Sequence, residues 1–487
     1  MTKSTIHFFH GLLWVGAGNI LGMIAGLVTI VLAIRLTSKE EIGAYFLVLV
    51  VAQFGAILGD IGLKNTAIKT LSAGLAPDAA HTARFLVTVT LLSSLATAIV
   101  VTMAVPLVMH LWPYPEFGKH AWLGALVAFS MINLQMAFSL LAGAGRFKEL
   151  SSLNAGIEIT KAVLSVATLL CGFGASGLLW ALILSRIVGI AFVWRLIPSQ
   201  FGLCLRHPNG LAMLKFGGWL YGGSVLSLVM VKASDTMLAT YMGIGALAIY
   251  SAAMQLPSAL LRVFEAIRPV LLSYVSSRTH TAAESLVESV RIGAGLLAVL
   301  ATVLIGIADP LMTLLFSPEY AGGVKVMQVL CAWTAIFIVN YYFSITLVGS
   351  GSPHKAFSLL VPQVIISMVT TWWLVPLFQG LGAAVALTVT SLLGNIIGAW
   401  VVAGDSRSLF LSLNAAHLRA ALPLLALLIA VCLLDYSAWQ MAGMVSAALG
   451  LLVLLGGVTV HDGRQLLVAV EAHRRQGLAP PLTSVNT

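Results

Sequence analysis

Charged residues are scarce in this sequence. Only 9% of its 487 residues are Asp, Glu, Lys or Arg, whereas 59% are hydrophobic and the mean hydropathy is +1.00. A water-soluble protein of this length needs about a quarter of its residues charged. The composition therefore excludes a soluble protein and indicates a chain whose solvent is lipid. The formal net charge of +9 does not indicate a nucleic-acid partner, because the basic residues are spread singly between apolar runs.

The short motifs that carry common chemistries are also missing. The sequence has no Gly-rich phosphate-binding loop and no His, Cys and Asp cluster at metal-ligand spacing, and its four cysteines lie far apart. The missing phosphate loop excludes an ATP-driven pump within this chain. We expect a protein that is not an enzyme and has no cofactor. Transport would draw on a proton or sodium gradient, on the substrate gradient or on a partner.

Long apolar runs dominate what is present. A spanning helix takes about 20 apolar residues, and the runs predict an all-α integral membrane protein with about fourteen spans. An even number of spans places both termini on one side, and most of the 26 Lys and Arg residues flank that side, which identifies it as cytoplasmic. The predicted spans are 12–34, 43–63, 84–109, 121–142, 153–172, 175–197, 213–233, 243–263, 291–316, 324–348, 356–377, 380–403, 419–434 and 438–460.

The connections between these spans are short. The longest outer one, 110–120, contains Trp112 and Tyr114, which we expect in the aromatic belt at the membrane surface. The polar end of the chain is predicted to be a cytoplasmic tail. The predicted units are a six-helix bundle over 1–200, a second over 201–405, two additional spans over 406–461 and the tail 462–487.

Two segments resemble each other. Residues 32–63 and 237–269 each contain a helix, a short break, a small residue two positions before Tyr45 or Tyr250, and a second helix ending in charge. Internal repeats of this kind are typical of transporters, whose substrate site lies between the two halves. The repeat predicts pseudo-symmetric bundles with a cavity between them.

Ionisable residues inside spans are costly and mark pathways or partners. Several fall at i, i+3 or i, i+4 spacing and can neutralise each other along one helix face. Arg186 has no local partner, and two interpretations stay open for it: pairing with Glu158 or lining a cavity. If the charged helices face each other, they form a cationic cleft for an anionic group such as a pyrophosphate. The predicted cleft residues are Arg35, Lys64, Lys232, Arg262 and Arg268; the predicted coupling or charge-pair residues are Asp60, Asp235, Glu158, Lys161, Arg186 and Glu265.

Four motifs together resemble the polysaccharide-export flippases of the MOP superfamily, the Wzx-type or O-antigen flippases. They are Gly43-Ala44-Tyr45 followed by Asp60-Ile61-Gly62-Leu63, Gly145-Arg146-Phe147, Asp235 followed by Tyr250-Ser251-Ala252-Ala253, and Leu315-Phe316-Ser317-Pro318-Glu319-Tyr320. The resemblance covers about residues 1–400. One departure is Thr37-Ser38, where the family has Gly-Pro.

The resemblance implies a V-shaped, MATE-like fold whose cavity is lined by spans one, two, seven and eight. It also implies alternating access that carries an undecaprenyl-pyrophosphate-linked oligosaccharide from the cytoplasmic to the periplasmic face of a bacterial inner membrane, for O-antigen, capsule or exopolysaccharide. A polymerase and assembly proteins are the implied partners. The alternatives are a lipid II flippase, a multidrug or cation antiporter, a polytopic glycan polymerase or ligase, and a scaffold subunit. A cationic cavity disfavours a cation exporter, and the short outer loops disfavour a polymerase.

Overall fold

The computed structural model describes residues 21–72, 79–197, 202–276, 282–349, 353–434 and 437–457. These residues form helices and connections without a strand. Ten of the helices are long and apolar enough to cross a membrane, and Leu21–Leu36 and Ala438–Leu454 are shorter apolar helices. The chain is a multi-pass membrane protein, and the predicted all-α membrane fold is confirmed, whereas the number fourteen stays a prediction. The predicted tail 462–487 lies outside the described residues.

The N-terminal half, residues 21–197, packs around α2 and α6. Thirteen residues of α2 are buried, and its start is capped by Ser38, whose side chain accepts from the Glu41 backbone N–H. The chain leaves helical geometry at Thr37 and Ser38, between the preceding helix and α2. The helices of this half are Leu21–Leu36, α2 (Lys39–Asp60), α3 (Leu63–Ser72), α4 (Ala79–Leu111), α5 (Pro115–His120), α6 (Leu123–Gly143), α7 (Phe147–Leu170) and α8 (Gly174–Leu196).

The C-terminal half, residues 202–457, packs around α13, which lies against α10, α11, α14 and α15. Helix α14 reverses direction at Gln379, whose φ is 53°, and an added Cβ on Gly382 would lie 2.1 Å from the Leu374 carbonyl oxygen. The elements are α9 (Gly210–Tyr241), α10 (Ile244–Ser276), α11 (Ala282–Gly306), α12 (Ala308–Leu311), the π-helix η2 (Met312–Phe316), the 3-10 helix η3 (Pro318–Gly323), α13 (Val324–Gly349), α14 (Pro353–Ala403), α15 (Arg407–Leu433) and α16 (Ala438–Leu454).

Several predicted boundaries differ from the structure, and at two places the cause is local. The span expected at 419–434 begins twelve residues earlier, at Arg407, because Ser406 caps the helix by accepting from the Leu409 backbone N–H. The connection expected after Leu63 is helical over α3, since the chain breaks for only two residues after Asp60. Lys64 lies within α3 and Arg419 within α15, so neither charged residue ends a helix.

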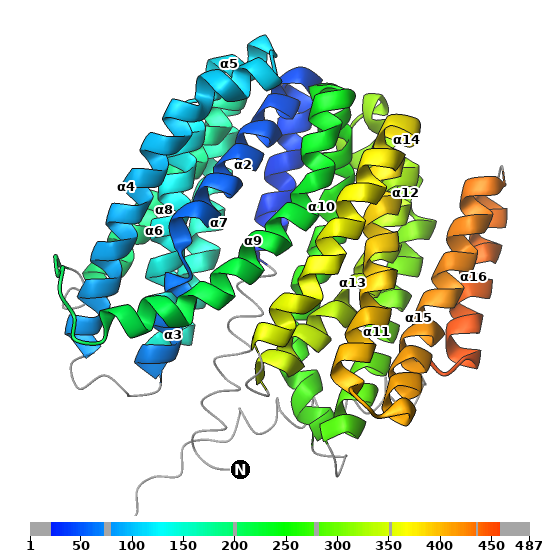
Figure 1. Ribbon diagram of the computed structural model, residues 1–487. Helices are drawn as coiled ribbons and strands as arrows, with labels where there is room; N and C mark the ends of the chain where they lie inside the picture. Colours follow the sequence, from blue (N-terminus) through cyan, green and yellow to red (C-terminus); the bar gives the residue numbers. More distant parts are fainter. Residues whose placement is uncertain are drawn as a thin grey trace, which may run out of the picture.

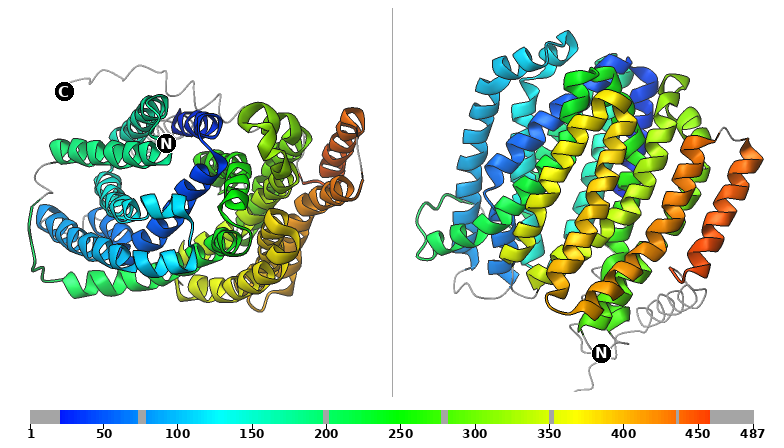
Figure 2. Two further views of the ribbon diagram at one scale, coloured as in Figure 1. Left: turned by 90° about the horizontal axis from the view of Figure 1, so that it is seen from above. Right: turned by 45° about the vertical axis from the view of Figure 1, so that its right-hand side comes forward.

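Figure 1 shows the two halves side by side, with α5 at the top and α3 at the bottom. We call the α5 end the outer end and the α3 end the inner end, following the charge distribution of the sequence. Seen from above, α16 lies at the far edge of the molecule from α4 (Figure 2). Helix α16 packs against α15 and α11, so the last two helices flank the C-terminal half.

Helix α9 runs diagonally between the halves (Figure 1). Its first turns pack on the N-terminal half, where the Thr66 hydroxyl donates to the Met213 carbonyl at 3.4 Å. Its later turns pack on α14, where the Ser367 hydroxyl donates to the Met230 carbonyl at 3.1 Å. One helix therefore connects both halves physically as well as in sequence.

The two similar segments of the sequence lie against each other. Helix α2 carries Tyr45, α10 carries Tyr250, and the two helices are packed together. At their closest point an added Cβ on Gly43 would lie 2.2 Å from the carbonyl oxygen of Ile244. Glycine is required there because backbone meets backbone across the junction. The junction of the halves is thus formed by the repeated segments.

Candidate functional site

A cavity of about 580 Å³ lies at the junction of the two halves. Its polar wall holds four basic side chains and one carboxylate, which gives the cavity an excess of positive charge. Tyr45 and Tyr250 both line it, so the residues that mark the sequence repeat face one space. The charged lining residues are Lys161 on α7, Arg186 on α8, Lys232 and Asp235 on α9, and Arg262 on α10.

Arg186 is the most informative of these residues. Its Nη1 lies 3.5 Å from both the Val127 carbonyl oxygen and the Ser130 hydroxyl on α6, which are long contacts to neutral groups. Among the described residues it forms no ion pair, since Glu158 pairs with Lys161 instead. A half-buried guanidinium with weak neutral partners has spare capacity for an anion. Of the two interpretations left open by the sequence, the structure places Arg186 on the cavity wall.

The two lysines of the cavity each have a carboxylate on their own helix. Lys232 Nζ lies 2.6 Å from Asp235 Oδ2, and both residues line the cavity. Lys161 pairs with Glu158, whose side chain also lies against Gly22 and Gly26 of the first helix. Each of these lysines in the membrane region thus has an opposite charge beside it. An anion that enters the cavity must compete with Glu158 and Asp235 for the two lysines. At Arg186 no carboxylate of the described residues forms an ion pair that the anion would have to displace.

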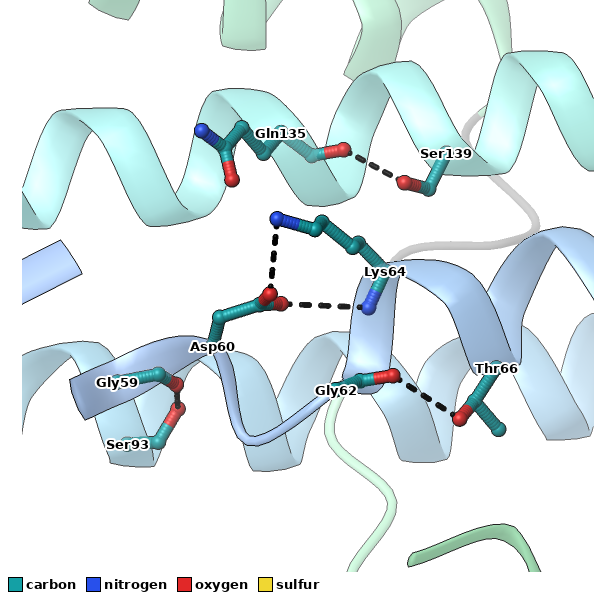
Figure 3. A network of polar contacts seen from close by, with 8 residues as sticks. All are labelled: Gly59, Asp60, Gly62, Lys64, Thr66, Ser93, Gln135 and Ser139. Carbon is teal, nitrogen blue, oxygen red and sulfur yellow. Dashed lines mark hydrogen bonds and ion pairs between the residues drawn. The ribbon is translucent and has the colours of Figure 1, made fainter. Parts of the chain in front are cut away.

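Lys64 and Asp60 lie away from the cavity, at the break between α2 and α3. Lys64 Nζ is 3.0 Å from Asp60 Oδ2, and the Lys64 backbone N–H donates to Asp60 Oδ1 at 3.4 Å. Figure 3 shows the lysine side chain lying over Asp60 and reaching toward Gln135 on α6. Neither residue lines the cavity, so this pair belongs to the inner half of the N-terminal bundle.

Arg35 lies at the outer end, apart from the central cavity. Its guanidinium donates to the carbonyl oxygens of Leu314 and Leu315, at the end of η2. Arg262 lines the cavity. Glu265 and Arg268 lie further along α10, and their side chains are outside the described part of the chain. The structure thus brings together Lys232, Arg262, Asp235, Lys161 and Arg186 from the predicted sets.

The structure adds aromatic residues that the sequence did not single out. Trp333 and Phe337 of α13 line the cavity with ring centroids 5.0 Å apart, and Phe46 of α2 contributes a third ring. No signal in the sequence indicated Trp333 and Phe337, because the apolar run of α13 carries no charge. Their role is visible only in the structure, where they line the same cavity as the repeated segments. The cavity is therefore lined from α2, α6, α7, α8, α9, α10 and α13. This set contains spans two, seven and eight of the four implied by the resemblance and adds α6, α7, α8 and α13. The expectation for span one is wrong for its described part, since no residue of Leu21–Leu36 lines the cavity.

Trp112 and Tyr114 correct the expectation of an aromatic belt. The Trp112 indole N–H donates to the Thr240 hydroxyl at 2.9 Å, and the Tyr114 hydroxyl donates to the Ala239 carbonyl at 2.7 Å. Trp112 is buried, so it faces the C-terminal half rather than lipid. Buried Trp and Tyr need a partner for their polar atom, and here the end of α9 supplies it.

The family model described as polysaccharide biosynthesis protein matches residues 31–325. The chain belongs to this family. A curated relative, the succinoglycan biosynthesis transport protein ExoT of Rhizobium meliloti (strain 1021), is 26% identical over 315 residues. That match covers 62% of this chain and 61% of the relative, so the chain spans less than two thirds of the relative's length. The predicted family resemblance is confirmed.

Solved structures share the fold at low identity. The lipid II flippase MurJ in an inward closed conformation has a TM-score of 0.69 at 12% identity, covering 93% of this chain and 100% of its own. An inward-facing multidrug resistance MATE transporter of the MOP superfamily has a TM-score of 0.61 at 15% identity, covering 85% and 99%. The chain therefore has a MOP-type transporter fold, and its relatives are transport proteins.

Proposed function

We propose that this protein moves an anionic lipid-linked oligosaccharide, with an undecaprenyl-pyrophosphate carrier, from the cytoplasmic to the periplasmic face of the bacterial inner membrane. The observation that carries the proposal is the cavity at the junction of the halves, with four basic side chains against one carboxylate. Pyrophosphate oxygens accept charge-assisted hydrogen bonds from Arg and Lys. The family match adds the pathway, polysaccharide biosynthesis.

In this proposal the two bundles, 1–200 and 201–405, alternate access around the cavity, with both termini in the cytoplasm. Arg186 holds the phosphate first because no carboxylate of the described residues pairs with it. Lys232 and Arg262 complete the site from the opposite half. The aromatic rings of Phe46 and Phe337 offer apolar faces for a sugar ring. An ion gradient, a polymerase and assembly proteins belong to the same proposal.

The test uses the full chain in liposomes that contain a fluorescent lipid-linked oligosaccharide. We expect the protein to move the label between leaflets without altering its chemistry. Arg186→Ala is expected to lower this rate by about tenfold or more, because charge-assisted hydrogen bonds contribute about 1.5–3 kcal/mol each. Arg195→Ala is the matched control, since Arg195 is exposed in the last turn of the same helix and does not line the cavity.

Three outcomes would contradict the proposal. A change in glycan length would indicate an enzyme, and no movement of the label by correctly inserted protein would remove the flippase function. Efflux of an organic cation with no effect of Arg186→Ala would indicate a MATE-like exporter. Lys232→Ala extends the test to the other half, where we expect loss of export with normal insertion. Normal export by Lys232→Ala would remove this lysine from the site.

A further inference from the structure

The outer ends of the two halves are joined by side chains that reach from one half to main-chain atoms of the other. Arg35 Nε donates to the Leu315 carbonyl at 3.1 Å, and its Nη2 donates to the Leu314 carbonyl. One helical turn later, Lys39 Nζ donates to the Glu319 carbonyl at 3.4 Å and lies over the Tyr320 ring. These contacts cross from the start of the N-terminal half to η2 and η3.

The acceptors of Arg35 are the carbonyls that a helix leaves unpaired at its end. Leu314 and Leu315 lie in the last residues of η2, just before Ser317 turns to extended backbone. Terminal carbonyls carry partial negative charge and need outside donors. The planar fork of arginine matches two neighbouring acceptors at once. The sequence places the only basic residue of Leu21–Leu36 at this position.

These contacts do not resemble ordinary surface ion pairs. Glu40 and Glu319 line the same outer pocket of about 1000 Å³, yet Arg35 and Lys39 donate to main-chain carbonyls. A carbonyl partner fixes the backbone of the opposite half in place, whereas a carboxylate partner can follow a moving lysine or arginine. The Trp112 and Tyr114 contacts to the end of α9 lie at this same end.

We propose that Arg35, assisted by Lys39, is a latch that holds the outer end closed and must release before the protein can open outward. The inference rests on the alternating access of the proposed function, but it concerns the motion and not the cargo. Arg35 is exposed, so its loss removes the latch without leaving a buried charge. The released carbonyls of Leu314 and Leu315 can bind water in the outer pocket.

The experiment measures opening at the outer end directly. The full chain, with Cys171, Cys204, Cys331 and Cys432 replaced by alanine, receives spin labels at Lys119→Cys and Ala321→Cys. Lys119 lies on α5 and Ala321 on η3, and both are exposed. In lipid nanodiscs without substrate, Arg35→Ala is expected to enlarge the population at long label–label distance by about threefold to tenfold, the effect of losing a solvent-exposed hydrogen-bonded contact.

Two further variants sharpen the result. Arg35→Lys retains the charge, but a lysine ammonium can donate well to only one of the two carbonyls. Its long-distance population should therefore lie between those of the parent and Arg35→Ala. Glu40→Gln removes a charge from the same pocket. Because the Glu40 carboxylate donates to no carbonyl of the other half, this substitution should leave the label–label distances unchanged. An unchanged distance distribution in Arg35→Ala overturns the latch, as does an equal response to Glu40→Gln.

The substrate-free measurement separates this inference from the proposed function. If Arg35→Ala opens the outer end while the protein fails to move a lipid-linked oligosaccharide, the latch stands and the cargo assignment falls. If the protein moves that cargo while the label–label distances are the same in the parent and in Arg35→Ala, the function stands and the latch falls.

Discussion

Two acid–base pairs of this chain look alike in sequence and have different surroundings in the structure. Asp60 and Lys64 are four residues apart with a 3.0 Å contact, and Lys232 and Asp235 are three apart with a 2.6 Å contact. Both acids are almost fully buried. The first pair brackets a break between two helices, whereas the second opens onto the cavity. The spacing of charges thus identifies a pair but not its role.

The break between α2 and α3 explains why the inner pair exists. Ile61 has a φ of 45° and Gly62 a φ of 74°, so the chain leaves helical geometry for two residues. A β-branched residue at positive φ is strained. Asp60 compensates by accepting both the Lys64 ammonium and the Lys64 backbone N–H across the break. The pair at Lys232, by contrast, lies within a continuous helix and closes no backbone gap.

Gly62→Ala should produce the largest effect. An added Cβ would lie 2.2 Å from the Gly217 carbonyl oxygen, and a side chain at φ 74° is strained as well. We expect the free energy of unfolding to fall by about 3 kcal/mol or more, since backbone strain of this kind costs about 1–3 kcal/mol before the clash is added. Thermal unfolding in detergent measures the change. Wild-type stability in this variant would show that α9 is not fixed against the break.

The paired substitutions Asp60→Asn and Asp235→Asn test the comparison itself. Asp60→Asn should lower the free energy of unfolding by about 2 kcal/mol, the value of a charge-assisted hydrogen bond, without changing the KM of the folded fraction for lipid-linked oligosaccharide. Asp235→Asn frees Lys232 inside the cavity, so the KM should fall severalfold because an internal competitor for the anion is gone. Flipping rates at several substrate concentrations, with melting curves, measure both.

The opposite pattern would reverse the two roles. If Asp60→Asn changed the KM while Asp235→Asn changed only the melting temperature, the inner pair would be the one that meets substrate. Asparagine keeps the side-chain volume in both variants, so a difference between them reports charge rather than packing.

The sequence was most informative where its signal was local. Apolar run length predicted the all-α membrane fold, and the repeated Gly43-Ala44-Tyr45 and Ala248-Ile249-Tyr250 segments identified the two helices that meet at the junction. Long-range placement was not available from the sequence. Nothing in the spacing of Arg35 or Trp112 indicates that each reaches main-chain or hydroxyl acceptors more than a hundred residues away. The cavity set of Arg186, Trp333 and Phe337 depends in the same way on how separate helices pack.

The smallest expected effect separates two neighbouring glycines of α9. An added Cβ on Gly217 would lie 3.1 Å from oxygens of Ile61, Gly62 and Thr66, whereas one on Gly218 would contact nothing within 4 Å. Replacing glycine by alanine in a helix contributes up to about 1 kcal/mol of stability. Gly218→Ala should therefore raise the melting temperature slightly, while Gly217→Ala should lose that gain to crowding at the α2–α3 break. Equal melting temperatures for the two variants would mean that α9 can move away from the break at no cost, and the tight inner contact would then not restrain the junction.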